Sequence, residues 1–193
     1  MTLSILYRFI RNNHTPVAES MQADPHNPQA TSLAKSRAAA GSGGLILRDF
    51  LPYRIAVLAR GISGSLGRKY RDLGITIPEW RLIAHLAEVG ACSSGEICAR
   101  TAMDKAKVNR AVIRLVAAGY VLAGISPHDR RVNVLKLTAK GQKIYERIVP
   151  IALDHESSLL APLSQAELKE LVRIIAKLQS RVDSMWTATD PAE

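Results

Sequence analysis

Residues 93–141 read SSGEICARTAMDKAKVNRAVIRLVAAGYVLAGISPHDRRVNVLKLTAKG, and the spacing of their apolar residues indicates the fold. In its first half the apolar residues recur every three or four positions, which predicts helices; in its second half they alternate, which predicts strands. Ser93 and Glu96 have the spacing of a capping box, in which each side chain bonds the backbone N–H of the other residue. A short helix is therefore expected to begin here and to end near Thr101.

A second helix is expected directly after the first. Asp104 is a favoured N-cap residue, and KAKVNRAVIRLVAA keeps helical spacing up to Gly119, a residue type that commonly follows a helix end. The predicted inner face of this helix is aliphatic and consists of Val108, Val112, Leu115 and Val116.

The period of the apolar residues then changes from helical to alternating. YVLAGIS at 120–126 and VNVLKLT at 132–138 are β-prone runs, and PHDRR at 127–131 joins them. This pattern predicts a β-hairpin with a charged tip.

Amphipathic helices are predicted before this stretch. The first runs from Phe50 to about Leu73 and ends near Gly74, and a second runs from Pro78 to Gly90, since proline is favoured in the first helical turn. The apolar stripe of the first helix consists of Leu51, Ile55, Leu58, Ile62 and Leu66.

Two further helices are predicted after it. Thr138 opens a long helix in which Pro150 is expected to produce a kink, and Ser164 and Glu167 form a second capping box for the last helix. Apolar residues of the last helix step by three and four, which is typical of a seam that packs against other helices. We expect a dimer interface there, made of Leu168, Leu171, Ile175, Leu178, Val182 and Met185.

Composition limits the possible partners and the compartment. The chain has 193 residues and a formal net charge of +9, and residues 94–140 carry nine Lys and Arg against three Asp and Glu. Such a basic excess indicates a polyanionic partner, either nucleic acid or an anionic membrane surface. No apolar run is long enough to span a membrane, and no secretory cleavage site follows the opening segment. Cys92 and Cys98 fit a reducing compartment, so a cytoplasmic protein is expected.

Three helices followed by a β-hairpin is the order of elements in a winged helix-turn-helix domain. The expected fold is mainly α with a small β-hairpin, formed by a winged helix-turn-helix lobe and a helical dimerisation lobe. The predicted boundaries are a flexible arm at 1–44, a domain at 45–186 with the winged lobe at about 76–138 and dimerisation helices at about 48–73 and 139–186, and a tail at 187–193.

The outer face of the helix after Asp104, together with the hairpin tip, suits double-stranded DNA. Arg and Lys donate to guanine edges, Asn can bond adenine with two hydrogen bonds, and small residues such as Ala106 and Ala111 permit close approach. The predicted DNA-contacting residues are Ser94, Lys105, Ala106, Lys107, Asn109, Arg110, Arg114, His128, Arg130 and Arg131.

The order of elements and several motifs resemble the multiple-antibiotic-resistance regulator (MarR) family. DRRVNVLKLTAKG at 129–141 is similar to the family's wing, which reads Asp-Arg-Arg, a strand, and Leu-Thr-x-x-Gly. Leu115, Gly119 and Val121 match its helix end and strand start. The resemblance covers roughly 48–186. FLPYR, IPEWR and TAMDKAKVNRAV (50–54, 77–81 and 101–112) resemble a branch often found beside aromatic-acid catabolic genes.

The resemblance implies a triangular homodimer, with the first and last helices of each subunit at the two-fold interface. It also implies that Arg130 or Arg131 enters the minor groove and that Asp129 orients one of them. Family members bind pseudo-palindromic operators and usually repress transcription. A small anionic or aromatic ligand, or cysteine oxidation, releases them from DNA.

Candidate effector residues are polar groups on otherwise apolar faces. Arg54 lies beside the apolar stripe of the first helix, where an arginine needs an anionic partner; a small aromatic carboxylate or its CoA thioester is one, and an internal ion pair or a side chain that reaches water is the alternative. Trp80 is more simply a core residue, and His85 more simply a satisfied surface histidine. The predicted effector-binding residues are Arg54, Tyr53, Arg60, Trp80, Arg81 and His85.

Two other functions stay open, and catalysis is not expected. Cys98 is most simply a core residue and Cys92 is expected to be exposed, so a cysteine-redox repressor is one alternative. A ligand-independent architectural DNA-binding protein is the other. No catalytic motif occurs, and 154–156, which reads Asp-His-Glu, is expected to be a solvated face because consecutive helical residues cannot converge on one ion. No cofactor and no metal site are expected.

Overall fold

The computed structural model describes residues 45–101, 103–125 and 133–189. The chain divides into two compact units, Met1–Phe50 and Leu51–Glu193. The described part of the first unit contains a single 3-10 turn, η1 (Leu47–Asp49), after which the Phe50 N–H donates to the Leu47 carbonyl oxygen at 3.2 Å.

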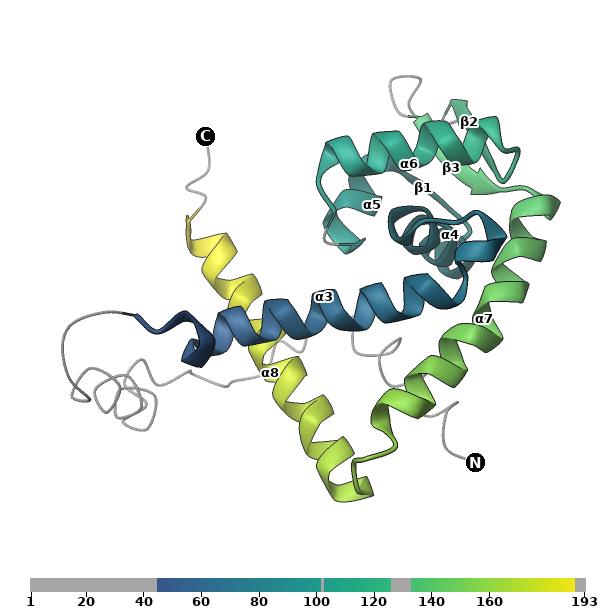
Figure 1. Cartoon of the computed structure of the whole chain (residues 1–193). Coiled ribbons are helices and arrows are strands. Elements are labelled where there is room, and N and C mark those ends of the chain that lie inside the picture. The colour runs from purple at the N-terminus through teal and green to yellow at the C-terminus, as the bar shows by residue number, and fades with distance from the viewer. Residues whose placement is uncertain (1–44, 102, 126–132, 190–193) are drawn as a thin grey trace. The chain divides into compact units, whose positions relative to one another are not determined.

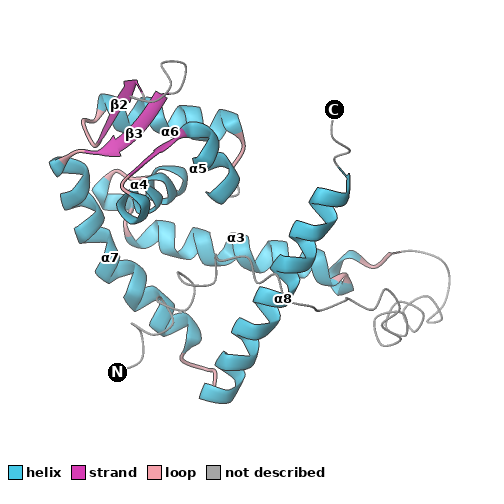
Figure 2. Ribbon diagram, turned by 180° about the vertical axis from the view of Figure 1, so that it is seen from behind, coloured by secondary structure: helices cyan, strands magenta, loops and turns pink. Residues whose placement is uncertain are grey.

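The second unit contains a lobe in which three helices pack with a small sheet (Figures 1 and 2). The helices are α4 (Ile77–Val89), α5 (Ser94–Thr101) and α6 (Lys105–Ala117). The antiparallel sheet has the order β1-β3-β2, with β1 at Ala91–Ser93, β2 at Val121–Ile125 and β3 at Asn133–Leu137. Mainly helical structure with a small sheet is the fold class that the sequence predicts.

Side-chain caps fix the helix starts at the predicted residues. Ser93 and Glu96 form the capping box of α5, with the Ser93 N–H donating to Glu96 Oε2 at 2.7 Å and the Glu96 N–H donating to Ser93 Oγ at 3.2 Å. Asp104 caps α6, where its Oδ1 accepts the Lys107 N–H at 2.7 Å. A further capping box, which the sequence analysis did not identify, joins Thr76 and Glu79 at the start of α4.

The long helices lie on either side of the lobe in the sequence. They are α3 (Leu51–Lys69), which is followed by the 3-10 turn η2 (Arg71–Leu73), then α7 (Ala139–Leu160) and α8 (Gln165–Thr189). α7 is continuous through Pro150, and the capping box of Ser164 and Glu167 opens α8 as predicted. Gly74 follows η2 with a φ of 72°, a left-handed conformation that glycine adopts without strain.

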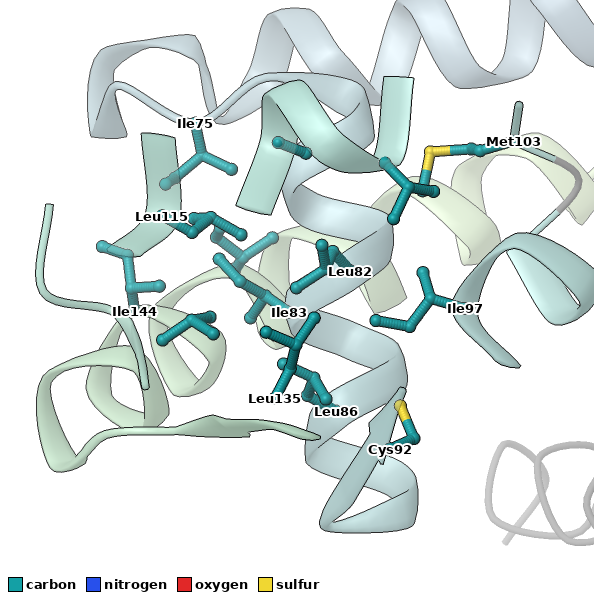
Figure 3. Close-up of a cluster of buried hydrophobic side chains, with 14 of the residues drawn as sticks. Ile75, Leu82, Ile83, Leu86, Cys92, Ile97, Met103, Leu115, Leu135 and Ile144 are labelled. Atoms are coloured by element: carbon teal, nitrogen blue, oxygen red, sulfur yellow. The ribbon is translucent and has the colours of Figure 1, made fainter. Parts of the chain in front are cut away.

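The hydrophobic core lies between α4, α5, α6, the inner face of the sheet and the first half of α7 (Figure 3). Leu82 and Ile83 of α4 are fully buried at its centre. On the sheet, Leu135 pairs with both Cys92 and Ala123, and Leu135 and Cys92 are buried on the inner face. The remaining core residues are Tyr70, Ile75, Leu86, Ile97, Met103, Val108, Ala111, Leu115, Val121, Ile144 and Ile148.

The inner face of α6 differs from the prediction at one position. Val108 and Leu115 are buried and Val112 is partly buried, as expected, but Val116 is exposed and Ala111 is buried in its place. The expectation that Ala111 faces a partner is therefore wrong. Since α4 packs closely against α6, the row 108, 111 and 115 points inward and a small side chain is required at its centre.

Other predicted environments are also corrected. Cys92 is predicted to be exposed, but the residue is only 7% exposed. It lies in β1, a strand too short to be recognised in the sequence, and faces the core. His85 is 9% exposed and not a surface histidine, and His155 is buried rather than part of a solvated face. The stripe of α3 is buried only toward its C-terminal end, where Ile62 and Leu66 are partly buried; Leu51, Ile55 and Leu58 are exposed.

Candidate DNA-binding surface and effector site

The outer face of α6 is the best-defined part of the candidate DNA-binding surface (Figure 1). Burial of 108, 111 and 115 fixes which way the helix faces. Ala106, Arg110 and Ile113 then form a row on the opposite side, spaced by four and three residues, and all three are exposed. Asn109 is exposed beside this row.

Two of the predicted cations on α6 are paired within the protein. Lys107 Nζ lies 2.7 Å from Asp104 Oδ2, and the Lys107 side chain and backbone N–H together hold the pKa of the Asp104 carboxyl below its ordinary value. Arg114 Nε lies 3.6 Å from Oε1 of Glu79, a buried carboxylate of α4. These contacts direct both cations toward the protein, although both remain exposed.

Lys105 and Arg110 carry the unpaired charge of this helix. Within the described part of the chain, neither forms an ion pair. Both are exposed, and Arg110 belongs to the outward row. Ser94 is half-buried at the first position of α5. Of the predicted DNA-contacting residues on α6, Arg110 is the best placed to donate to an external acceptor, because it is exposed, unpaired and in the outward row.

The predicted wing residues His128, Asp129, Arg130 and Arg131 lie outside the described residues. The strands that flank them are described: β2 and β3 pair from Val121 opposite Leu137 to Ile125 opposite Asn133. β2 contacts α6, so the hairpin base and the outer face of α6 belong to the same lobe (Figure 2).

The candidate effector residues lie on α3 and α4, and one of them, Arg81, contacts the other helix. Arg81 of α4 is half-buried, and its Nη2 donates to Ser63 Oγ of α3 at 3.0 Å. Arg54, Tyr53 and Arg60 are exposed on the first half of α3, and none of the three forms an ion pair with another described residue. Arg81 is therefore the predicted effector cation that joins the two helices.

An aromatic cluster next to Arg81 supports the prediction that Trp80 is a core residue. The Trp80 ring stacks on Tyr145 with centroids 6.0 Å apart and lies 6.1 Å from Tyr70. Tyr70 is buried, and its hydroxyl has no hydrogen-bond partner among the described residues. Burial raises the pKa of Tyr70 to about 12, against an opposing effect of the Arg81 charge.

His155 of α7 and Ser65 of α3 form a second polar contact between helices. Ser65 Oγ donates to the Ile62 carbonyl oxygen at 2.9 Å, so its only hydroxyl proton is used. His155 Nε2 lies 2.7 Å from Ser65 Oγ, within hydrogen-bond distance. Close by, Lys69 Nζ lies 2.8 Å from Asp154 Oδ2 and lowers the pKa of that carboxyl.

His85 and Cys92 lie in buried surroundings. His85 Nε2 is buried without a hydrogen-bond partner among the described residues, and burial lowers the pKa of the ring, assisted by the Arg100 charge. Burial also raises the pKa of the Cys92 thiol, so this cysteine lacks the thiolate character of a redox sensor. Cys98 is half-buried. Among the described residues no group of three His, Cys, Asp or Glu could hold a metal ion.

Comparison with known proteins identifies the family. The MarR family model matches residues 73–132, which include α4, β1, α5, α6 and β2. The HTH-type transcriptional regulator FarR of Neisseria gonorrhoeae is 30% identical over 113 residues, which cover 57% of this chain and 77% of FarR. The chain belongs to the MarR family. MarR proteins are DNA-binding transcriptional regulators and not enzymes, so this chain is a DNA-binding transcriptional regulator.

A second relative and a solved structure are also similar to this chain. The HTH-type transcriptional repressor Rv2887 of Mycobacterium tuberculosis is 28% identical over 132 residues, covering 68% of this chain and 92% of the relative. The structure of Bordetella bronchiseptica BpsR, a protein whose DNA binding is regulated by 6-hydroxynicotinic acid, matches with a TM-score of 0.64 and 24% identity. It covers 72% of this chain and 98% of BpsR, and it shows the same fold.

Three features of this MarR chain were not found by sequence reasoning. The contact between Glu79 and Arg114 and the contact between Ser65 and His155 join helices that are distant in sequence, so no local pattern signals them. The exposure of Ile113 at 68% could have been found, because helical spacing puts it on the same face as Arg110. No helix in the described ranges is long and apolar enough to cross a membrane.

Proposed function

We propose that this chain is a homodimeric repressor that reads a pseudo-palindromic operator through α6 and the hairpin tip, and that a small aromatic acid or its CoA thioester releases it. The observation that supports DNA reading by α6 is the outward row of Ala106, Arg110 and Ile113. In it an exposed arginine without an internal ion pair stands beside Asn109, and these two side chains suit guanine and adenine respectively. The wing arginines Arg130 and Arg131 would add minor-groove or phosphate contacts, with Asp129 orienting one of them.

Substitution of Arg110 tests the DNA-reading surface. Arg110→Ala should weaken operator binding by about 1–3 kcal/mol and relax preference at one base position per half-site, because a bidentate contact to guanine is lost. Lys143→Ala removes one positive charge from an exposed position of α7 and is the matched control. Fluorescence anisotropy with an in vitro selected duplex measures both. Equal losses in the two variants would reduce the role of Arg110 to general electrostatics.

The exposed apolar residues of α8 support the homodimer. Leu171, Ile175, Leu178 and Val182 are exposed in the single chain at helical spacing, as are Leu51, Ile55 and Leu58 at the start of α3. A second copy that covers both rows would remove them from water and would place two α6 helices at successive major grooves. We therefore assign dimerisation to the helices in about 48–73 and 139–186 and DNA binding to the lobe at about 76–138, within a domain at 45–186 flanked by an arm at 1–44 and a tail at 187–193.

The contact between Arg81 and Ser63 supports an effector site between α3 and α4. Among the described residues, this half-buried guanidinium bonds only a neutral hydroxyl, and it can exchange that partner for a carboxylate, which forms a stronger, charge-assisted bond. The charge of Arg81 acts on Tyr70, whose ring contacts Trp80, and Trp80 in turn stacks on Tyr145. Regulation of BpsR by an aromatic acid, as stated for that protein, agrees with this effector class. Tyr53, Arg54, Arg60 and His85 are the remaining candidate effector residues.

Two arginine variants separate the possible anchors of the effector. A hundredfold release from DNA requires a difference of about 2.7 kcal/mol in effector affinity between the two states. Arg81→Met should keep operator affinity and lose the response to aromatic acids, as measured by calorimetry and operator titration. Arg54→Met is the parallel variant on the exposed half of α3. If only Arg54→Met abolishes the response, the anion binds on the first half of α3 instead.

A further inference from the structure

We infer that Ile113 contacts the C5-methyl group of a thymine in each operator half-site and selects thymine over cytosine there. The inference rests on the proposed role of α6 and adds to it an apolar specificity contact. Its starting observation is that Ile113 is 68% exposed, the highest exposure among the large apolar side chains of the winged lobe that the structure describes.

The position of Ile113 on α6 is fixed by the residues that are buried. At 100° per residue, Ile113 points about 170° away from the mean direction of Val108, Ala111 and Leu115. It therefore lies on the line of the helix that is farthest from the core, in one row with Ala106 and Arg110. Any molecule that contacts Arg110 along this helix meets Ile113 next.

The surroundings of Ile113 indicate a polyanionic partner rather than an apolar one. Arg110 and Arg114 lie three residues before it and one residue after it, and Lys105 and Lys107 occupy the same helix. Lys107 and Arg114 have carboxylate partners within the protein, but a protein partner that buried Ile113 would also have to neutralise the unpaired charges of Lys105 and Arg110. The DNA major groove supplies negative charge from its phosphates, and its only apolar group is the thymine methyl.

The spacing along the helix agrees with contact to adjacent base pairs. Ile113 is three residues beyond Arg110, about 4.5 Å along the helix axis, and base pairs are stacked about 3.4 Å apart. If Arg110 bonds one base pair, Ile113 faces the next one or the one after. Ala106 and Ala117, both exposed, add little bulk before and after these two residues, so the helix can approach closely enough for the short isoleucine side chain to reach the groove floor.

Removal of single methyl groups from the DNA tests the contact directly. An operator duplex selected in vitro with the full chain is resynthesised with deoxyuridine in place of each thymidine in turn, which deletes only the methyl group. Burial of one methyl group corresponds to about a fourfold change in affinity, so one position per half-site should weaken wild-type binding about fourfold. Replacement in both half-sites should weaken it about fifteenfold, because the two contacts are independent.

Variants of the protein assign the methyl effect to Ile113. Ile113→Ala should bind the thymidine and deoxyuridine duplexes equally at that position, whereas Ile113→Val should retain most of the difference. Leu122→Ala is the matched control, because Leu122 is 61% exposed on β2 and outside the row on α6. It should keep the full methyl effect. Both residues are exposed, so the variants should fold as the wild type does.

The outcomes are distinguishable. If Ile113→Ala keeps the wild-type methyl effect at every position, or if no position in the wild type shows one, the inference is wrong. The proposed reading surface still stands in that case provided that Arg110→Ala loses affinity and base preference. If Arg110→Ala also binds like wild type, both the inference about Ile113 and the proposed role of α6 in reading DNA are wrong. Loss of the dimer in Ile113→Ala, measured by sedimentation, would show that a second copy covers Ile113 instead and would also overturn the inference.

Discussion

Substitution of Gly141 by alanine tests how the hairpin is joined to α7. Gly141 lies in the first turn of α7 and is buried. A Cβ atom at this position would overlap the carbonyl oxygen of Tyr120, and it would lie 3.0 Å from the Tyr120 carbonyl carbon and 3.1 Å from Leu137 Cδ2. Two of these three atoms belong to the backbone at the start of the hairpin, so no rotamer change relieves the overlap.

Hydrogen bonds around Thr138 set the cost of relieving the overlap. The Thr138 N–H donates to the Tyr120 carbonyl oxygen at 3.0 Å, and Thr138 Oγ1 donates to the Gly119 carbonyl oxygen at 2.7 Å and accepts the Gly141 N–H at 2.9 Å. Moving α7 away from the hairpin weakens the two bonds from Thr138 to Tyr120 and Gly119 and the capping bond to Gly141, at about 1 kcal/mol each. The higher helix propensity of alanine returns about 1 kcal/mol. The net loss in the free energy of unfolding is therefore about 2 kcal/mol.

Thermal unfolding measures this loss. A destabilisation of this size should lower Tm by about 4–8 °C for a domain of this length. Gly64→Ala is the control, because a Cβ at Gly64 meets nothing within 4 Å, and it should raise stability by about 0.5–1 kcal/mol through helix propensity alone. The proteins must be compared at equal concentration, since the proposed dimerisation would contribute to Tm. A Gly141→Ala protein that melts at or above the wild-type temperature would refute the reasoning.

Three further predictions concern pH, assembly and charge. Burial and the Arg100 charge lower the pKa of His85, and the charges of Glu88 and Glu96 only partly oppose them. Below pH 6.5 the unfolded chain therefore binds a proton that the folded chain does not. The free energy of unfolding should be at its full value above pH 6.5 and fall below it. His85→Leu should flatten that part of the pH profile, by at most about 1.4 kcal/mol per pH unit; an unchanged slope assigns it to other groups. Leu178→Glu puts a charge into the apolar seam of α8 and should give a monomer in sedimentation. Lys177→Glu, next to the seam, is the control and should stay dimeric. If both variants sediment as dimers, the interface lies elsewhere. Glu79→Gln keeps the oxygen that caps α4 and removes the charge that pairs with Arg114. The freed Arg114 should increase the salt dependence of DNA binding by up to about one phosphate contact. An unchanged salt slope would exclude Arg114 from the DNA interface.

Features set by short-range rules could be predicted from the sequence. The caps at Ser93, Asp104, Thr138 and Ser164 each involve a side chain and an N–H three residues later, so spacing alone identifies them. The hairpin strands and α6 were found for the same reason, since their apolar periods are local. The predicted MarR membership is confirmed, because the motifs that carry it lie in the same segment.

Features that depend on tertiary packing could not be predicted. β1 has three residues and becomes a strand only by pairing with β3, far along the chain, and this pairing turns Cys92 inward. His155 was expected on a solvated face and is instead buried against Ser65, because α3 and α7 pack together there. Ala111 takes the place of Val116 on the inner face of α6, the helix that packs against α4 and α5. In each case the deciding neighbour belongs to another element.

α4 contacts both the proposed DNA-reading helix α6 and the proposed effector site. Glu79 uses one carboxylate oxygen to cap its own helix at Thr76 and the other to hold Arg114 of α6. Arg81, two residues later, bonds Ser63 of α3. One helix thus carries both the contact to the DNA-reading element and the contact to the proposed effector site. A ligand that replaced Ser63 as the partner of Arg81 would remove this side-chain contact between α3 and α4. Because Glu79 pairs with Arg114, any movement of α4 would then also move Arg114. If the two proposed sites are coupled through α4, single substitutions of Glu79 and Arg81, which cut these two contacts, should weaken the coupling.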